Sequence, residues 1–260
     1  MTAPTRAAAL AEAIRHPKRP ARPAVMPYLI GGWPDAASWG TTLLEVAEVA
    51  DAIEVGVPFS DPMADGPVIQ RASRQALDAG VTLDGILGAL ASLPRPPACP
   101  LVLMSYVNPL LAMGLDTVLA RAQRAHIHGF IVPDLPWEES GALRAACIEA
   151  GLALVQLVTP ATPSDRLARL TARDDGFVYA VTVNGITGAA FEADAVHAYL
   201  DRVRAVSHAP VCAGFGIRTA NDVDALVGHA DGAIVGTALI QHLLDGGDAP
   251  TYVRALARAG

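Results

Sequence analysis

Lysine is almost absent from this sequence: Lys18 is the only one among 260 residues, and it precedes the first apolar run. An aldolase that works through a Schiff base needs a desolvated lysine inside the fold, and so does covalently held pyridoxal phosphate. The sequence therefore excludes both, and any carbon–carbon chemistry must use acids and bases.

Cysteine and long apolar runs are also scarce. Cys99, Cys147 and Cys212 stand far apart without a CxxC pair, which is typical of a reducing compartment. No apolar run approaches the roughly 20 residues of a membrane span. Residues 6–22 are basic but lack the apolar core of a secretory signal. We expect a cytoplasmic protein, with a transit peptide as the alternative.

The charge balance is acidic, with a net charge of −7 and scattered arginines. Nucleic acid is therefore not an expected partner. A phosphorylated metabolite stays open as a ligand, because backbone amides bind phosphate without nearby Lys or Arg. Since 52% of the residues are hydrophobic, the chain is expected to fold around a large core.

Short apolar runs alternate with helical patterns along the whole sequence. Eight such runs recur, each followed by a helix, at residues 25–30, 52–57, 101–107, 130–132, 152–158, 177–181, 211–214 and 233–235. This α/β repeat predicts a (β/α)8 TIM barrel formed by one domain, residues 1–260, with a short extra N-terminal helix over residues 6–15. A doubly wound open sheet is the alternative.

Carboxylates in and after the second apolar run are candidate catalytic residues, because active sites of this fold lie at the carboxyl ends of the strands. Glu54 stands inside the second apolar run, where a carboxylate is costly unless it is paired or functional. Its position favours a general acid or base, the alternative being a cap on neighbouring backbone. Asp61 and Asp65 lie in the following loop. Asp65 could equally be a turn residue, and Asp61, which precedes Pro62, fits a turn better still.

A metal held by these carboxylates is not expected. None of the seven histidines directly follows a predicted strand in HxH or HxxxE spacing, and such spacing is typical of metal ligands.

Glycine-containing loops follow the last three predicted strands, at residues 184–188, 213–216 and 235–237. Barrels often bind phosphate with the loops after strands seven and eight, through backbone amides and a helix N-terminus. Thr237 can add a hydroxyl. Each glycine alone could merely end a helix or strand, but together they indicate a phosphate site.

Residues 54–67, EVGVPFSDPMADGP, resemble the signature of the tryptophan synthase alpha chain family, E-x-G-x-P-F-S-D-P-x-A-D-G-P. Further matches follow in order across nearly the whole chain: residues 106–109 (YVNP), 133–136 (PDLP), Tyr179, residues 185–188 (GITG), 214–217 (GFGI) and 236–237 (GT).

The resemblance implies a reaction, the retro-aldol cleavage of indole-3-glycerol phosphate to indole and glyceraldehyde 3-phosphate in L-tryptophan biosynthesis. Glu54 would shuttle the protons, Asp65 would accept the indole N–H, and Tyr179 would help to position Glu54 and the substrate. No cofactor is implied for this chain. The implied partner is the beta chain, which carries pyridoxal phosphate, in an alpha2-beta2 heterotetramer.

The resemblance also assigns binding residues. Those implied for phosphate are Gly188, Gly216, Gly236 and Thr237; for the indole pocket Tyr28, Met104, Tyr106 and Phe215; and for the beta chain Pro58, Asp61, Asn108 and Pro136.

Two long loops, the one carrying Asp65 and residues 183–192, are predicted to close over bound substrate. The sequence departs from the family pattern at Ile30, where threonine is common, at residues 183–184, and at Thr237, a frequent serine position. These departures bear on rate and partner response rather than on reaction type.

Three other readings stay open. They are a stand-alone lyase that releases free indole, a catalytically silent barrel that only activates a partner, and another phosphate-binding barrel such as an isomerase.

Overall fold

In the computed structural model, strands and helices alternate along the chain. The structure describes residues 4–173, 176–181, 193–214 and 216–257. The strands are β1 (Ala24–Ile30), β2 (Ile53–Gly56), β3 (Leu101–Met104), β4 (Ile127–Ile131), β5 (Ala153–Leu154), β6 (Gln156–Val158), β7 (Val178–Val181), β8 (Val211–Gly214) and β9 (Gly232–Val235). The helices are α1 (Arg6–Arg15), α2 (Trp39–Ala47), α3 (Pro67–Asp78), α4 (Leu83–Ala91), α5 (Val107–Met113), α6 (Leu115–Arg124), α7 (Gly141–Glu149), α8 (Ser164–Leu170), α9 (Ala193–Arg204), α10 (Ala220–Asp224), α11 (Thr237–Leu244) and α12 (Ala249–Leu256).

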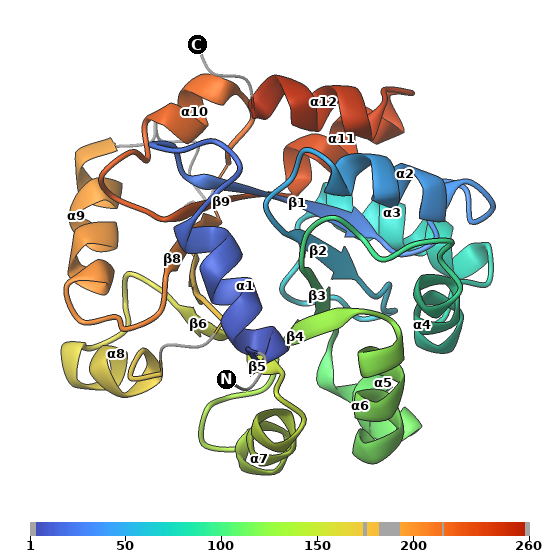
Figure 1. Ribbon diagram of the computed structural model, residues 1–260, viewed down its shortest axis with the longest axis horizontal. Helices are drawn as coiled ribbons and strands as arrows, with labels where there is room; N and C mark the ends of the chain where they lie inside the picture. The colour runs from blue at the N-terminus through green and yellow to red at the C-terminus, as the bar shows by residue number, and fades with distance from the viewer. Residues whose placement is uncertain (1–3, 174–175, 182–192, 215, 258–260) are drawn as a thin grey trace.

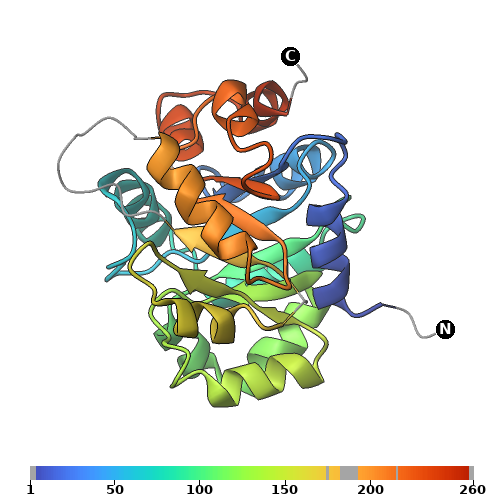
Figure 2. The same cartoon turned by 90° about the vertical axis from the view of Figure 1, so that its left-hand side faces the viewer.

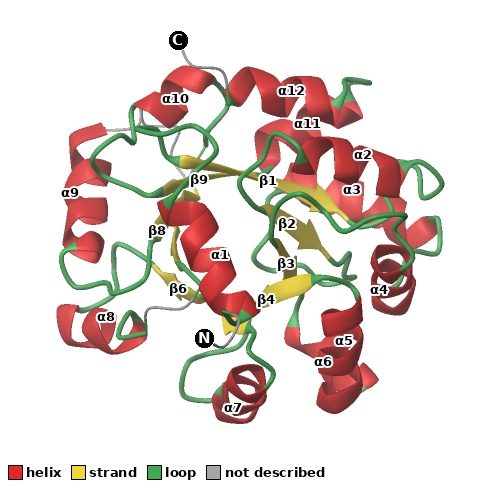
Figure 3. Ribbon diagram, viewed as in Figure 1, coloured by secondary structure: helices red, strands yellow, loops and turns green. Residues whose placement is uncertain are grey.

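The strands form a parallel ring that the helices surround (Figures 1 and 3). β1 pairs with both β2 and β9, so the first and last strands lie side by side. β5 and β6 are separated by Val155 alone and pair with β4 and β7 respectively. They are two parts of one strand, so the nine segments occupy eight strand positions. The predicted TIM barrel is confirmed, and the open sheet is wrong.

Burial explains why the apolar runs become strands here. All seven residues of β1 are buried, as expected of a parallel strand that packs against the barrel interior on one side and helices on the other. The larger apolar cluster fills the layer between the strands and the outer helices. A second cluster lies inside the ring and includes Met26, Val102 and Ile234.

The extra N-terminal helix, α1, closes one end of the barrel. It begins at Thr5, whose side chain accepts a hydrogen bond from the backbone N–H of Ala8. Its apolar face buries Leu10 and Ile14 against the interior cluster. Figure 2 shows α1 at one side of the strand ring. This helix seals the end of the barrel at which the strands begin, and leaves the opposite end open.

The third and fourth strands differ from the prediction. The run 101–107 was expected to be strand throughout, but β3 ends at Met104, and residues from Val107 onward form α5. Pro109 lies in the first turn of α5, where its missing N–H costs no hydrogen bond. β4 begins at Ile127 rather than at residue 130, because His128 and Gly129 interrupt the apolar pattern without interrupting the sheet.

No helix among the described residues is long and apolar enough to cross a membrane.

Candidate active site

A cavity of about 770 Å³ opens at the carboxyl ends of the strands. Residues of β1, β2, β3, β7, β8 and β9 line it, together with residues of α3 and α11. The two helices lie against each other beside the ring. The cavity therefore sits where the barrel fold predicts an active site.

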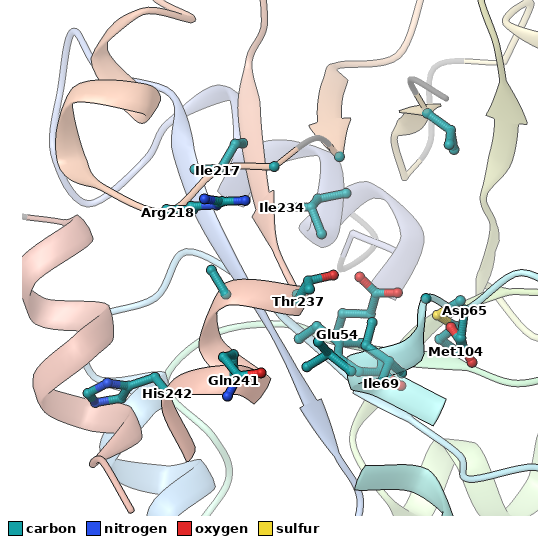
Figure 4. A pocket seen from close by; sticks show the side chains of 18 of the residues that line it. Glu54, Asp65, Ile69, Met104, Ile217, Arg218, Ile234, Thr237, Gln241 and His242 are labelled. Atoms are coloured by element: carbon teal, nitrogen blue, oxygen red, sulfur yellow. The ribbon is translucent and has the colours of Figure 1, made fainter. Parts of the chain in front are cut away.

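Glu54 projects from β2 into this cavity (Figure 4). Its side chain is buried, with a relative exposure of 1%, and its Oε2 atom has no hydrogen-bond partner among the described residues. Burial, and secondarily the charge of Asp65, raise the pKa of Glu54 to about 8. At neutral pH this carboxyl group therefore carries a proton that it can give and take back.

Two tyrosine rings flank the site because two glycines leave room for them. A Cβ on Gly56 would lie 2.1 Å from the hydroxyl of Tyr28, and one on Gly214 would lie 2.3 Å from the ring of Tyr179. Both tyrosines line the cavity. Within the described residues Tyr179 makes no hydrogen bond to Glu54, but its pKa is raised well above its usual value, first by burial and then by the charge of Glu54. Tyr179 is thus close enough to Glu54 for the charge of the carboxylate to affect the phenol electrostatically.

We expect Gly56→Ala to destabilise the protein by about 1–3 kcal/mol, because the new Cβ displaces the buried Tyr28 ring. Urea unfolding measures the free energy of unfolding. Gly141→Ala is the matched control, since a Cβ there meets nothing within 4 Å and the residue begins α7. Equal stability of the two variants would contradict the packing argument.

Asp65 lies in the loop between β2 and α3, and it also lines the cavity. Burial raises its pKa to about 6, although a hydrogen bond from Tyr106 acts in the opposite direction. Asp65 is therefore ionised at neutral pH while Glu54 is protonated. Two carboxyl groups in one cavity with different charge states can perform different tasks.

Tyr106 holds the loop of Asp65 in place. Its hydroxyl donates to Asp65 Oδ2 at 3.3 Å and accepts from the backbone N–H of Ala64 at 2.9 Å. Its ring stacks on Phe59, with the ring centres 5.0 Å apart. Tyr106 was predicted to line the indole pocket, but among the described residues it is not part of the cavity wall. It lies behind Asp65, where the loop covers it.

We expect Tyr106→Phe to lower kcat by about 2- to 10-fold, the range of one hydrogen bond. Without this hydrogen bond the pKa of Asp65 rises, so the acid limb of the pH–rate profile moves to higher pH. Steady-state rates from pH 5 to 9 test this. Tyr199→Phe is the control, because it removes a buried hydrogen bond to Val158 without touching the cavity. A profile that moves equally in both variants would argue against a role at Asp65.

The predicted phosphate end of the cavity contains Gly216, Gly236 and Thr237. Gly236 precedes α11, and no side chain caps this helix at its N-terminus. The first N–H groups of α11 and its dipole therefore face the cavity without an anionic partner. Two other predicted residues, Gly188 of the phosphate site and Phe215 of the indole pocket, lie outside the described residues. So does the whole second predicted lid loop, residues 183–192, which includes the departure at residues 183–184.

The residues Tyr28 and Met104, predicted for the indole pocket, line the cavity. Ile69 of α3 and Ile234 of β9 line the cavity as well. Neither residue was predicted from the sequence to be a pocket residue. An isoleucine inside a strand or helix pattern carries no signal that distinguishes a pocket wall from the core. Ile30 does not line the described cavity; it is buried in an apolar cluster with Trp33.

Three of the four residues predicted to face a partner, Asp61, Asn108 and Pro136, are exposed. Pro58 is instead buried, as are Val57 before it and all four residues of β2. Met63, in the same loop as Asp61, is an exposed apolar residue, with 81% of its surface accessible.

The cavity contains no lysine, since Lys18 donates its Nζ hydrogen to the carbonyl oxygen of Ala47 near the start of β1. Within the described part of the chain, no three His, Cys, Asp or Glu side chains form a cluster suited to a metal ion.

Comparison with known proteins points to one family. A family model described as tryptophan synthase alpha chain matches residues 14–257. The chain is 45% identical over 248 residues to the tryptophan synthase alpha chain of Desulfovibrio desulfuricans, covering 94% of this chain and 97% of the relative. It is 43% identical over 222 residues to that of Bacillus cereus, covering 85% and 86%. A solved structure of Mycobacterium tuberculosis tryptophan synthase superimposes with a TM-score of 0.87 at 35% identity, covering 98% of this chain and 100% of the other.

Proposed function

Because this chain belongs to the tryptophan synthase alpha chain family, we propose that Glu54 and Asp65 perform the reaction of that family in the cavity at the open end of the barrel. The chain is a lyase of this kind: it cleaves indole-3-glycerol phosphate to indole and glyceraldehyde 3-phosphate in tryptophan biosynthesis. The observation that carries the assignment of residues is the buried Glu54 side chain, which lines the cavity and whose Oε2 atom has no hydrogen-bond partner in the part of the chain that the structure describes.

Glu54 first acts as the acid. With a pKa of about 8 it is protonated at neutral pH, and it gives this proton to indole C3. The resulting carboxylate then takes the proton of the hydroxyl on the adjacent side-chain carbon. The bond between C3 and that carbon breaks, its electron pair returns to the indole ring, and the hydroxyl-bearing carbon becomes the aldehyde. One residue thus serves both steps and ends protonated.

Asp65 stabilises the intermediate. Protonation of C3 places positive charge on the indole nitrogen, and the ionised Asp65 accepts the N–H hydrogen bond there. Tyr106 orients this carboxylate through its hydrogen bond to Oδ2. Tyr179 borders Glu54 and helps to position it and the substrate.

The remaining cavity residues divide by polarity. Tyr28, Met104 and Phe215 bind the indole ring, and Gly188, Gly216, Gly236 and Thr237 bind the phosphate. The uncapped N-terminus of α11 supports the phosphate site, because its free N–H groups favour an anion. The loop of Asp65 and residues 183–192 close over the substrate and exclude water.

The partner is a tryptophan synthase beta chain, and the assembly is an alpha2-beta2 heterotetramer in the cytoplasm. Pyridoxal phosphate belongs to the beta chain, and this chain, one domain over residues 1–260, needs no cofactor. The exposed Asp61, Asn108 and Pro136 contribute to the interface.

The test is indole release from indole-3-glycerol phosphate by the pure chain, with and without a beta chain. Slow release that rises steeply on addition of the partner supports the proposal. Fast release by the chain alone indicates a stand-alone lyase. No release under either condition, with the partner nevertheless activated, indicates a catalytically silent barrel and overturns the roles of Glu54 and Asp65.

A further inference from the structure

Arg218 is a feature of the cavity that the motif analysis did not single out. It lies between β8 and α10, two residues after Gly216, and it lines the cavity together with Gly216, Gly236 and Thr237. Its side chain points into the cavity (Figure 4). The side chain is exposed, so the guanidinium is accessible to a ligand that enters from solvent.

The backbone of Arg218 is fixed on both sides. Its N–H donates to Asp222 Oδ2 at 2.9 Å, and its carbonyl oxygen accepts from the hydroxyl of Tyr252 at 2.7 Å. Asp222 in turn forms the capping box of α10 with Thr219. The base of the side chain is therefore fixed by hydrogen bonds within the protein before a ligand enters, which is how a binding residue is preorganised.

The guanidinium itself is unpaired in the described part of the chain. Asp222, four residues further along the chain, accepts hydrogen bonds at Oδ2 from the N–H of Arg218 and from both the N–H and the hydroxyl of Thr219. Asp245, which also lines the cavity, accepts a hydrogen bond from Gln241 Nε2 at 2.8 Å. No hydrogen bond or ion pair joins the Arg218 side chain to any described residue, so its donors face the cavity unused.

Most of the ionisable side chains that line the cavity together with Arg218 are acids or tyrosines. Three carboxyl groups, those of Glu54, Asp65 and Asp245, line the cavity. His242 also lines it, and its Nε2 accepts a hydrogen bond from the N–H of Asp248 at 3.1 Å. Among the described lining residues, Arg218 is thus the one that is always positively charged.

We propose that Arg218 binds the phosphate group of the substrate through its guanidinium, adding a charged side-chain clamp to the backbone amides at Gly216 and Gly236. This inference rests on the proposed function, because it assumes the phosphorylated substrate. A dianionic phosphate that enters a cavity lined by carboxylates is repelled, and a guanidinium offsets that repulsion while it donates two parallel hydrogen bonds. Helix amides alone supply only partial charges.

Steady-state kinetics of Arg218→Gln and Arg218→Lys, together with calorimetric titration of glycerol 3-phosphate, test the proposal. In Arg218→Gln we expect KM for indole-3-glycerol phosphate and the dissociation constant of glycerol 3-phosphate to rise by about 10- to 100-fold, the range of one charge-assisted hydrogen bond. We expect kcat to change little, because the phosphate is bound equally in the ground and transition states. In Arg218→Lys, KM and the dissociation constant should lie between those of Arg218→Gln and those of the unaltered protein. Lysine keeps the charge but cannot form the two parallel hydrogen bonds.

Arg254→Gln is the matched control, because it removes the same charge from an exposed position on α12 outside the cavity wall. Cleavage of indole glycerol without phosphate should be equally fast in Arg218→Gln and Arg254→Gln. The proposal is overturned if glycerol 3-phosphate binds both variants equally well. It is also overturned if Arg218→Gln raises KM for indole-3-glycerol phosphate and for indole glycerol to the same extent. The titration needs no catalysis, so a protein that binds glycerol 3-phosphate through Arg218 but releases no indole would refute the proposed reaction and leave the phosphate clamp standing.

Discussion

Glu54→Gln is expected to lower the rate of indole release by about 100- to 10,000-fold, the usual contribution of a positioned general acid and base. Glutamine keeps the size of the side chain but can neither give a proton to indole C3 nor take one from the hydroxyl. Release of indole from indole-3-glycerol phosphate, with and without the beta chain, measures the loss. Glu45→Gln is the control, since Glu45 is exposed on α2 and should leave the rate unchanged.

The same variant should be more stable than the unaltered protein. Glu54 has an ordinary pKa of 4.5, but burial and Asp65 raise it to about 8 in the folded state. Between these values the folded state holds a proton that the unfolded state has released, so the stability of the unaltered protein falls as pH rises. Glu54→Gln removes this penalty, and its advantage in Tm should grow from pH 5 to pH 8. An active, less stable Glu54→Gln variant would refute both the catalytic role and the buried, unpaired state of Glu54.

Asp65→Asn is expected to lower kcat by about 100- to 1000-fold, the cost of removing one group that stabilises the developing charge. A neutral amide can accept the indole N–H but cannot offset the positive charge on the ring. Asp78→Asn, at an exposed position on α3, controls for the loss of a surface charge.

The pH profile of Asp65→Asn tests how the two carboxyl groups interact. In the unaltered protein kcat/KM should be bell-shaped, falling below about pH 6 as Asp65 is protonated and above about pH 8 as Glu54 loses its proton. In Asp65→Asn the acid limb should disappear. The basic limb should move to lower pH, because the charge that helps to raise the pKa of Glu54 is gone. A basic limb that stays in place would show that burial alone sets the pKa of Glu54.

Much of the fold, and the family, was predictable from local sequence. Eight apolar runs, each followed by a helical pattern, indicated a closed parallel barrel, and the structure confirms it. The signature around Glu54 and Asp65 is contiguous, so its resemblance to one family did not depend on knowing the tertiary structure. The comparisons confirm that family.

Predictions that needed side-chain direction were less successful. Tyr106 has the right residue type for a pocket wall, yet it lies behind Asp65 and holds the loop. Pro58 belongs to the signature but is buried. A sequence motif specifies which residues are close along the chain, whereas the fold decides which face of each residue meets the cavity, the core or the solvent.

The sequence by itself determined the barrel and the family, and it singled out two carboxylates as candidates, because strand periodicity and a continuous signature are local properties of the chain. Only the tertiary structure decided the charge states of Glu54 and Asp65 and the place of Arg218. A pKa depends on burial and on neighbours that folding brings together. Arg218 lies 164 positions after Glu54 along the chain. The two residues line the same cavity only because the barrel brings the carboxyl ends of β2 and β8 to one end.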